Sequence, residues 1–317
     1  MDMPVSPNPE GPVLVIGAAS IDIVGRLRGD LHKETSNQAF IRTAPGGVAR
    51  NIAENLARLG QPAVLLTAVG SDDNGDYLLE QTARAGVDIG SVLRAEHCPT
   101  GSYLGVLNNR GSLAYALDDM RAVASVTPDY LEANVEHFKS ASMLFLDANL
   151  SKETLRKAFS LARKHKLPVG ADPTAMPLTH RLKPYLSRLT MIVPNEAEAS
   201  LLCDRPIEIG KRRSALIAAK HLVSMGVKLA IVTLAQLGVV YATSETSGQI
   251  PAIRTEIIDA TGAGDALTAA VIFAILNDIP LDDAMQLGVS AASLTLRHPG
   301  ATNPELSLEK LYDQLVI

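Results

Sequence analysis

Short apolar runs alternate along the chain with segments whose apolar residues recur at helical spacing. Because each run is short and continuous, we expect buried strands at 13–17, 63–69, 143–146, 168–171, 191–193 and 229–234. The periodic segments predict helices at 52–59, 73–85, 131–138, 155–162, 196–202, 214–225, 266–276, 284–294 and 308–315. This alternation is typical of a mostly parallel sheet with crossover helices, so the expected fold class is α/β.

One stretch interrupts this alternation. Residues 103–107 and 113–117 flank a polar turn at 108–111, which is the pattern of a β-hairpin. We expect this hairpin to leave the main sheet and form a lid. Asp118 and Asp119 at its exit are either solvated turn residues or groups that return to a binding site. Residues 26–43 are polar and predict an irregular segment, whereas 239–242 predict a hairpin partner for 229–234.

Several predicted strands end at a polar residue. Asp147 and Asp172 each follow an apolar run directly, and Asn195 follows the run at 191–193 after Pro194. In open α/β sheets the ligand crevice lies outside the carboxyl ends of the strands. The placement therefore predicts a binding site along this edge of the sheet.

Chain length, net charge and cysteine content narrow the class of protein. With 317 residues and no linker-like segment, we expect a single domain at 13–317 behind a loose, proline-rich tail at 1–12. A formal net charge of −5 gives no indication of a nucleic-acid or membrane partner, and the apolar segment 266–276 is too short to span a bilayer. Cys98 and Cys203 are far apart, and no secretory signal is evident, so we expect a cytoplasmic protein.

The segment 258–270 carries the strongest chemical signal. Small residues at 261–264 open the apolar helix, so a phosphate can approach backbone N–H groups at a helix N-terminus. Asp265 lies beside this proposed anion site. It is either a general base for an attacking hydroxyl or an early-turn carboxylate that complements the helix dipole.

A second glycine turn lies near the other end of the chain. Gly46 and Gly47 precede a helix that carries Asn51, so backbone N–H groups and an amide can meet the hydroxyls of a ligand. Asp22 stands in an apolar stretch and needs a partner, which is either a ligand hydroxyl or a backbone N–H.

Several other chemistries lack their motifs in this sequence. There is no GxxxxGK[ST], no HExxH, no GxSxG and no GxGxxG after Gly17, and the adjacent His97 and Cys98 have poor ligand geometry. Two glycine turns with a carboxylate beside the second suit phosphoryl transfer to a hydroxyl acceptor.

Three segments together resemble the signatures of the PfkB, or ribokinase-type, family of carbohydrate and nucleoside kinases. Residues 46–53 with Gly60 and Gly70 fit its first signature, 194–198 resemble its Asn-x-x-Glu motif, and 259–265 resemble its second signature. They occur in the expected order and cover nearly the whole chain. The resemblance implies a ribokinase-like three-layer α/β/α sandwich with a small β-sheet lid at about 24–45 and 99–119.

The resemblance also implies roles for the matching residues. The general base is Asp265, and the anion hole is Gly262, Ala263 and Gly264. The acceptor is held by Asp22, Gly46, Gly47, Asn51 and Asp119. ATP is bound near Asn195, Thr233, Gly238 and Thr261. Mg²⁺ is organised by Asn195 and Glu198, and a monovalent cation such as K⁺ by Asp259, Thr261 and the carbonyls of 295–300.

Within the family, 45–56, 117–120 and 147–149 are similar to the pseudouridine kinase branch. This implies transfer to the 5′-hydroxyl of pseudouridine; the alternatives are a kinase for ribose, another sugar or a purine nucleoside, and a non-catalytic nucleoside sensor. Ala49, Ala235, Leu237 and Ala260 depart from the usual pattern. Since relatives often pair through the lid and its apolar face would be exposed, we expect a homodimer.

Overall fold

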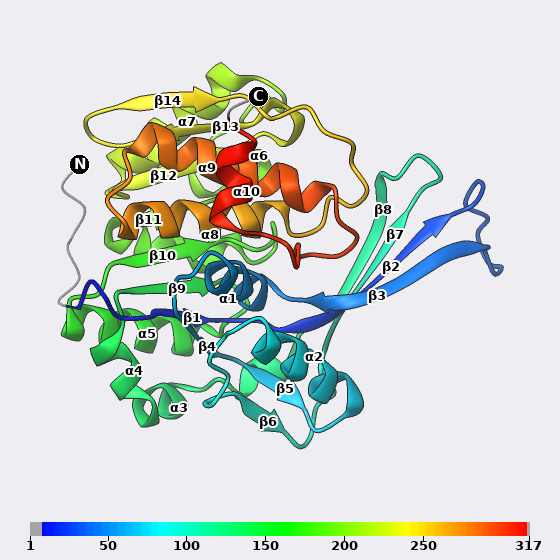
Figure 1. Ribbon diagram of the computed structural model, residues 1–317, viewed down its shortest axis with the longest axis horizontal. Helices are drawn as coiled ribbons and strands as arrows, with labels where there is room; N and C mark the ends of the chain where they lie inside the picture. Colours follow the sequence, from blue (N-terminus) through cyan, green and yellow to red (C-terminus); the bar gives the residue numbers. More distant parts are fainter. Residues whose placement is uncertain (1–7, 316–317) are drawn as a thin grey trace.

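The main sheet is eight-stranded and mostly parallel. The computed structural model describes residues 8–315, and its strand order is β14-β13-β12-β11-β10-β9-β1-β4 (Figure 1). The strands are β1 (Val13–Ile16), β4 (Ala63–Leu66), β9 (Met143–Asp147), β10 (Val169–Asp172), β11 (Met191–Ile192), β12 (Leu229–Thr233), β13 (Val239–Ala242) and β14 (Ser247–Ile250). The antiparallel pairs are β12 with β13 and β13 with β14, so β13 is the strand of this sheet that runs opposite to the others. The predicted α/β class is confirmed.

Helices cover both faces of this sheet, which explains why its strands read as continuous apolar runs. Leu14 and Ile16 of β1 point into one core, whereas Val13 and Val15 point into the other. The first core is covered by α3 (Pro128–Ala133), α4 (Val135–Ser140), α5 (Lys152–His165), α6 (Glu196–Leu202) and α7 (Arg212–Ser224). The second is covered by α1 (Val48–Arg58), α8 (Ala263–Leu276), α9 (Leu281–Leu296) and α10 (Leu308–Asp313). The sandwich therefore has three layers.

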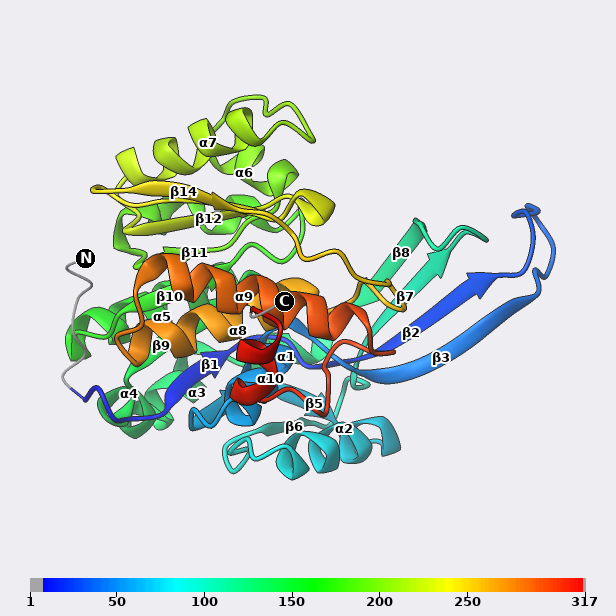
Figure 2. The ribbon, with the colours of Figure 1, turned by 45° about the horizontal axis from the view of Figure 1, so that its top comes forward.

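Helix α8 lies in the interior of the second layer. Every residue from Asp265 to Ala274 is buried, and α9 runs beside it in both ribbon views (Figures 1 and 2). A helix that is apolar on all sides is stable only where neighbours surround it. The expectation of a buried helix here is confirmed, and its N-terminus is held rigidly below the glycine turn.

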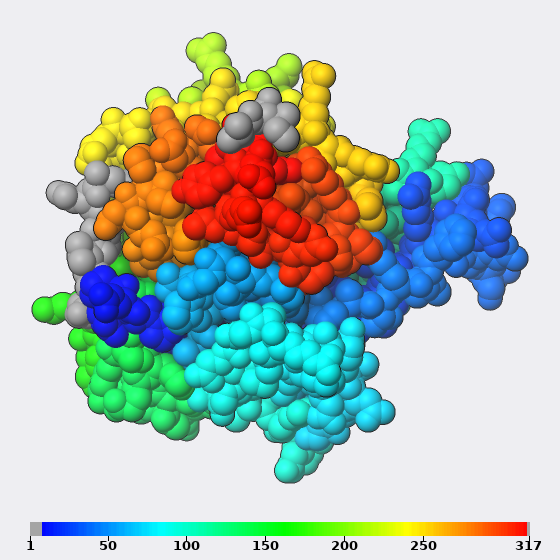
Figure 3. Space-filling model, viewed as in Figure 1, coloured from blue at the N-terminus to red at the C-terminus, as the bar shows by residue number. Residues whose placement is uncertain are grey.

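A second sheet projects from the body as a lid (Figures 1, 2 and 3). Its order is β3-β2-β7-β8, with β2 (Ser20–Leu27), β3 (Ala39–Gly46), β7 (Gly101–Leu107) and β8 (Leu113–Asp119). The predicted hairpin of β7 and β8 is confirmed. The prediction of an irregular segment at 26–43 was wrong at 26–27, which end β2, and from Ala39 onward, because β3 pairs with β2. Both faces of β3 are partly exposed, so its sequence lacks the apolar alternation of a covered strand.

Smaller differences concern element ends. The apolar run at 63–69 splits into β4 and β5 (Ala68–Gly70), and β5 pairs with β6 (Leu93–Ala95) in a third sheet. The remaining helical elements are α2 (Asp73–Arg84), η1 (Arg121–Ser125), η2 (Thr179–Arg181), η3 (Lys183–Arg188) and η4 (Ala235–Leu237). The segment 131–138 forms two short helices, α3 and α4.

Within residues 8–315, no helix combines the length and apolarity needed to cross a membrane.

Candidate active site

The two glycine turns meet at one point of the molecule. Helix α1 begins after Gly47 and helix α8 after Gly262, and both helices lie on the same face of the sheet. The Asn51 Nδ2 atom of α1 donates a hydrogen bond of 2.7 Å to Asp265 Oδ2 of α8. Segments more than 200 residues apart in the chain thus form one site. This is the juxtaposition that phosphoryl transfer between two turns requires.

The turn before α8 is open to a ligand. Gly262 has φ +74°, and a Cβ at this position would lie 1.8 Å from the Ala301 carbonyl oxygen. No side chain caps the first N–H groups of α8. Gly264 is exposed, and a Cβ there would meet no atom within 4 Å. Uncapped N–H groups at an accessible helix N-terminus favour an anion such as a phosphate.

The two glycines of this turn give opposite predictions. Gly262→Ala is expected to destabilise the protein by at least about 1–2 kcal/mol, because an L-residue is strained at this φ and also meets Ala301. Gly264→Ala is expected to keep or raise the melting temperature, since alanine favours a helix and has room here. Its methyl group would nevertheless face the anion, so we expect kcat to fall at least about tenfold.

Thermal unfolding and steady-state kinetics on the two variants check this. A Gly264→Ala variant with the kinetics of the parent chain would contradict the placement of the phosphate.

Asp265 has the protonation behaviour of a base poised near neutral pH. It is buried in the first turn of α8. Burial raises its pKa to about 7, and the charges of Asp22 and Asp147 act in the same direction, while the Asn51 amide and Arg50 oppose them. An early-turn carboxylate that merely complemented a helix dipole would have a lowered pKa. Burial, and not the helix dipole, therefore dominates the pKa of Asp265.

Asp22 lies where β2 passes the first glycine turn. A Cβ on Gly46 would lie 2.1 Å from Asp22 Oδ1, so only glycine leaves room for this carboxylate. Its hydrogen-bond partner among the described residues is the Ser20 hydroxyl, at 3.1 Å, rather than a backbone N–H. Burial raises the pKa of Asp22 to about 6. A ligand hydroxyl remains the better partner for it.

A buried arginine, Arg50, connects the parts of the site. It is fully buried, and it donates to the Gly46 carbonyl at 3.0 Å and to the Pro45 carbonyl at 3.2 Å. It also donates to Asn51 Oδ1 and forms an ion pair with Glu54. The amide of Asn51 is thereby oriented, with its oxygen toward Arg50 and its nitrogen toward Asp265. The sequence placed an arginine here, but nothing in its helical pattern predicted that it would be buried.

Asp147 is a second residue whose role the sequence did not reveal. It ends β9, and its carboxylate accepts hydrogen bonds from the N–H groups of Ala18 at 2.8 Å, Ala49 at 3.2 Å and Asn149 at 2.9 Å. The carboxylate holds the end of β1 against the start of α1. Its position at a strand end was the available signal.

The structure separates Asp118 from Asp119. Register partners share a face of a sheet, and Asp118 pairs with Tyr103, which pairs with Asp22. Asp119 lies on the opposite face, where its carboxylate binds Arg121. The side chain of Asp119 therefore does not lie with the predicted acceptor-binding residues. Asp118 is the residue that shares the lid face of Asp22. Side-chain alternation along the strand decides this.

Asn195 and Glu198 form the N-terminal capping box of α6. The Glu198 N–H donates to Asn195 Oδ1 at 3.0 Å, and the Asn195 N–H donates to Glu198 Oε2 at 2.9 Å. Burial and the neighbouring charge of Glu198 raise the pKa of Asp172 well above its usual value, and burial raises that of Glu198. The neighbouring carboxyl groups of Asp172 and Glu198 offer oxygen ligands that fit Mg²⁺. This ion is held by one or two carboxylates together with water and substrate phosphates. Residues 8–315 contain no cluster of three acidic, His or Cys ligands, consistent with such a sparse site.

Thr233 and Gly238 lie at the next strand end. Thr233 ends β12 and forms a bridge with Asn195, so both residues border the same edge. Gly238 has φ +91°, and a Cβ there would lie 2.1 Å from the Ile250 carbonyl oxygen. Ala235 has φ +47°, a left-handed conformation that glycine would adopt with less strain.

The surroundings of Asp259 do not fit a monovalent cation. Asp259 Oδ1 accepts from the Thr261 N–H at 3.0 Å, and Oδ2 accepts from the Gly300 N–H at 2.8 Å. The guanidinium of Arg42, from lid strand β3, forms an ion pair with the same Oδ2. Burial raises the pKa of Asp259, but these hydrogen bonds and Arg42 outweigh it and lower the pKa overall. Each carboxylate oxygen has two lone pairs, so the backbone donors alone leave room for a cation, but the positive guanidinium of Arg42 at Oδ2 opposes a second positive charge there.

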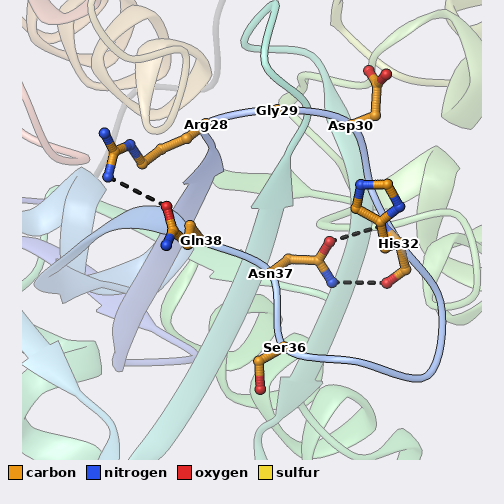
Figure 4. A pocket seen from close by; sticks show the side chains of 7 residues that line it. All are labelled: Arg28, Gly29, Asp30, His32, Ser36, Asn37 and Gln38. Atoms are coloured by element: carbon orange, nitrogen blue, oxygen red, sulfur yellow. Dashed lines mark hydrogen bonds between the residues drawn. The ribbon is translucent and has the colours of Figure 1, made fainter.

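A separate pocket lies at the tip of the lid, between β2 and β3. It is lined by Arg28, Gly29, Asp30, His32, Ser36, Asn37 and Gln38 (Figure 4). The Asn37 side chain binds the backbone of His32 there. None of the residues that line this pocket is among the predicted acceptor-binding or phosphate-binding residues, so the pocket lies apart from the candidate active site.

Comparisons with known proteins agree with this geometry. The model of the pfkB family carbohydrate kinases matches residues 12–308. The chain is 33% identical to the pseudouridine kinase of Escherichia coli K12 over 297 residues, which are 93% of this chain and 94% of that protein. It is 27% identical over 283 residues to the guanosine-inosine kinase of Exiguobacterium acetylicum, covering 89% of this chain and 93% of that one.

Two solved structures have the same fold. A carbohydrate kinase from Agrobacterium tumefaciens is 29% identical, with a TM-score of 0.80 over 96% of this chain and 97% of that chain. Ribokinase from Arabidopsis thaliana, complexed with ribose and ATP, is 24% identical, with a TM-score of 0.85 over 97% of this chain and 99% of that chain. The ribokinase-like architecture is thereby established.

Proposed function

The chain belongs to the pfkB family of carbohydrate kinases, and on that premise we propose that it transfers a phosphoryl group from ATP to the 5′-hydroxyl of pseudouridine. It is a phosphotransferase that acts on a hydroxyl group. The observation that carries the reaction is the contact of Asn51 with Asp265. It joins the glycine turn at 46–47, the acceptor turn, to the glycine turn at 261–264, the anion turn. Similarity to the pseudouridine kinase of Escherichia coli supports the choice of acceptor.

In the proposed reaction, the acceptor lies between the two turns. Asp22, Asn51 and the N–H groups of Gly46 and Gly47 hold its ribose hydroxyls, and the face of the lid that carries Asp22 and Asp118 covers it. Asp265 takes the proton of the 5′-hydroxyl as the oxygen attacks. Most of the rate acceleration comes from the alignment of the two reactants and from neutralisation of the charge on the transferring phosphoryl group.

The transferring phosphoryl group lies against the N–H groups of Gly262, Ala263 and Gly264. Because these donors are fixed by α8, they need no rearrangement when charge develops on the phosphoryl oxygens. Thr233, Gly238 and Thr261 border the nucleotide. Asn195, Glu198 and Asp172 would hold Mg²⁺ largely through water, and the ion would supply positive charge to the phosphate oxygens.

A panel of acceptors tests the proposal. Pseudouridine, uridine, inosine, guanosine, ribose and deoxyribose are each incubated with ATP and Mg²⁺, and both ADP and the phosphorylated product are measured. We expect the highest kcat/KM for pseudouridine. A clear preference for ribose or for a purine nucleoside would replace the acceptor but keep the reaction.

A non-catalytic nucleoside sensor would give a different pattern. Calorimetry would then show tight binding of a nucleoside while no phosphorylated product accumulates. We expect instead that binding and turnover occur together, because binding alone does not require a buried Asp265.

The pH dependence follows from Asp265. A base works only when it is ionised, and the pKa of Asp265 is raised to about 7 by burial. We therefore expect kcat/KM for the acceptor to rise with pH, with a midpoint near the pKa of about 7, and to level off above it. Asp22, with its pKa raised to about 6, adds to the loss at lower pH. Initial rates measured across this range with saturating ATP check the prediction, and a flat profile through neutral pH would argue against Asp265 as the base.

We also infer a homodimer that pairs through the lid. Ile41, Leu104, Tyr115 and Leu117 share the face of the lid opposite Asp22, and they are 72%, 40%, 57% and 68% exposed. A cluster of large apolar side chains on one face is typical of an interface. Light scattering is expected to give twice the mass of one chain, and a monomer at micromolar concentration would exclude the pairing.

A further inference from the structure

The lid contributes a cation to the base of the anion turn. Arg42 lies on β3 opposite Val24 of β2, on the face of the lid that also carries Asp22. Its guanidinium reaches Asp259, three residues before the glycine turn at Gly262. Arg42, Asp259, Thr261 and Gly300 line one small pocket together with Asp22. The ion pair therefore joins the lid to the segment that orients the phosphate-binding N–H groups.

Asp259 is the acceptor around which this segment is arranged. Its two oxygens accept the N–H groups of Thr261 and Gly300, so it ties the residue just before the Gly262 turn to the loop at Gly300. It is 5% exposed, and a buried carboxylate stays charged only where hydrogen-bond donors or a positive partner stabilise it. Among the described residues, Arg42 is the cation whose ion pair with Asp259 is seen. Arginine stays protonated at any pH at which the protein is folded.

We propose that the Arg42 guanidinium replaces the monovalent cation at Asp259, so that the enzyme works without K⁺. The guanidinium occupies the side of the carboxylate that a cation would need, and its fixed charge repels a second cation at that distance. Its positive charge adds to the backbone N–H donors of Thr261 and Gly300 in keeping Asp259 ionised and tied to the anion turn. The proposal rests on the proposed kinase function only for its kinetic consequence.

The test compares the parent chain, Arg42→Ala and Arg42→Gln in potassium chloride and in choline chloride at equal ionic strength. For the parent chain we expect the same kcat/KM for ATP in both salts, within about twofold. Both variants are expected to lose at least about tenfold in choline, the scale of a lost charge-assisted bond, and to regain part of it in K⁺. Arg26→Gln is the matched control, because the side chain of this lid arginine donates to the Asn109 carbonyl of the hairpin turn, and we expect its salt response to equal that of the parent chain.

A second measurement does not depend on the substrate. Melting temperatures of the protein alone are recorded in the same two salts. The parent chain is expected to melt at the same temperature in both, whereas K⁺ should specifically stabilise the two Arg42 variants. If no acceptor in the panel is phosphorylated, the proposed function fails while this measurement still decides the role of Arg42.

Two results would overturn the inference. One is activation or specific stabilisation of the parent chain by K⁺, which would mean that a cation binds despite Arg42. The other is Arg42 variants that respond to K⁺ in neither measurement, since the guanidinium would then not stand in for a cation.

Discussion

Asp265→Asn is expected to lower kcat by at least about 100-fold, the contribution of a positioned general base. Asparagine can still accept the hydrogen bond from Asn51, so the geometry of the site is kept while the proton acceptor is lost. Binding of the acceptor should change little. Steady-state kinetics with the preferred acceptor, together with calorimetry of acceptor binding, separate the two effects.

The stability of this variant provides its own control. The folded-state pKa of Asp265 is about 7, above the ordinary aspartate value of 3.8, so the charged form destabilises the fold above neutral pH. Stability from this group is present at low pH and is lost as pH rises through about 7. We therefore expect Asp265→Asn to melt at or above the parent temperature in mildly alkaline buffer, which excludes misfolding as the cause of lost activity.

Asp283→Asn is the matched kinetic control. Asp283 is also an acid in the first turn of a helix, α9, but it is exposed and outside the site. Its kinetics should be unchanged. An Asp265→Asn variant with full turnover would remove Asp265 from the proposed role.

Arg50→Met is expected to cost about 3–5 kcal/mol of unfolding free energy, the range for breaking a buried ion pair. The substitution leaves the carbonyls of Gly46 and Pro45 without their donor, and Glu54 loses its buried partner. It also frees the Asn51 amide, which Arg50 orients toward Asp265. We expect kcat to fall as well, because the acceptor turn and Asp265 are then no longer held in a fixed relative position. Urea unfolding and kinetics measure the two losses.

Arg58→Met is the control for this experiment. Arg58 contacts the same Glu54 at 2.7 Å, but it lies nearer the surface, with a side chain 20% exposed. Arg58 also donates to the Pro304 carbonyl at 2.7 Å, but it has no contact with Asn51, so we expect Arg58→Met to lower stability while kcat stays close to that of the parent chain. The difference between the two variants isolates the network that reaches Asn51. An Arg50→Met variant with parent kinetics would show that Asn51 is oriented without Arg50.

The sequence determined the layers of the fold and the chemistry of the two turns. Apolar runs such as those of β1 and β9 specify strands covered on both faces, because every side chain along them must avoid water. The apolar helix after Gly262 specified burial in the same way. Gly46, Gly47 and Gly262 were recognisable because the conformation or close approach that each permits is available only to glycine.

The tertiary structure alone decided which polar groups meet. The contacts of Asn51 with Asp265 and of Arg42 with Asp259 join residues more than 200 positions apart, and no local period specifies such pairs. The choice between Asp118 and Asp119 depends on strand register, which shifts every side chain to the other face when it changes by one residue. Local sequence encodes conformation and burial, whereas hydrogen bonds and ion pairs between distant segments exist only after the sheet and its helices have packed.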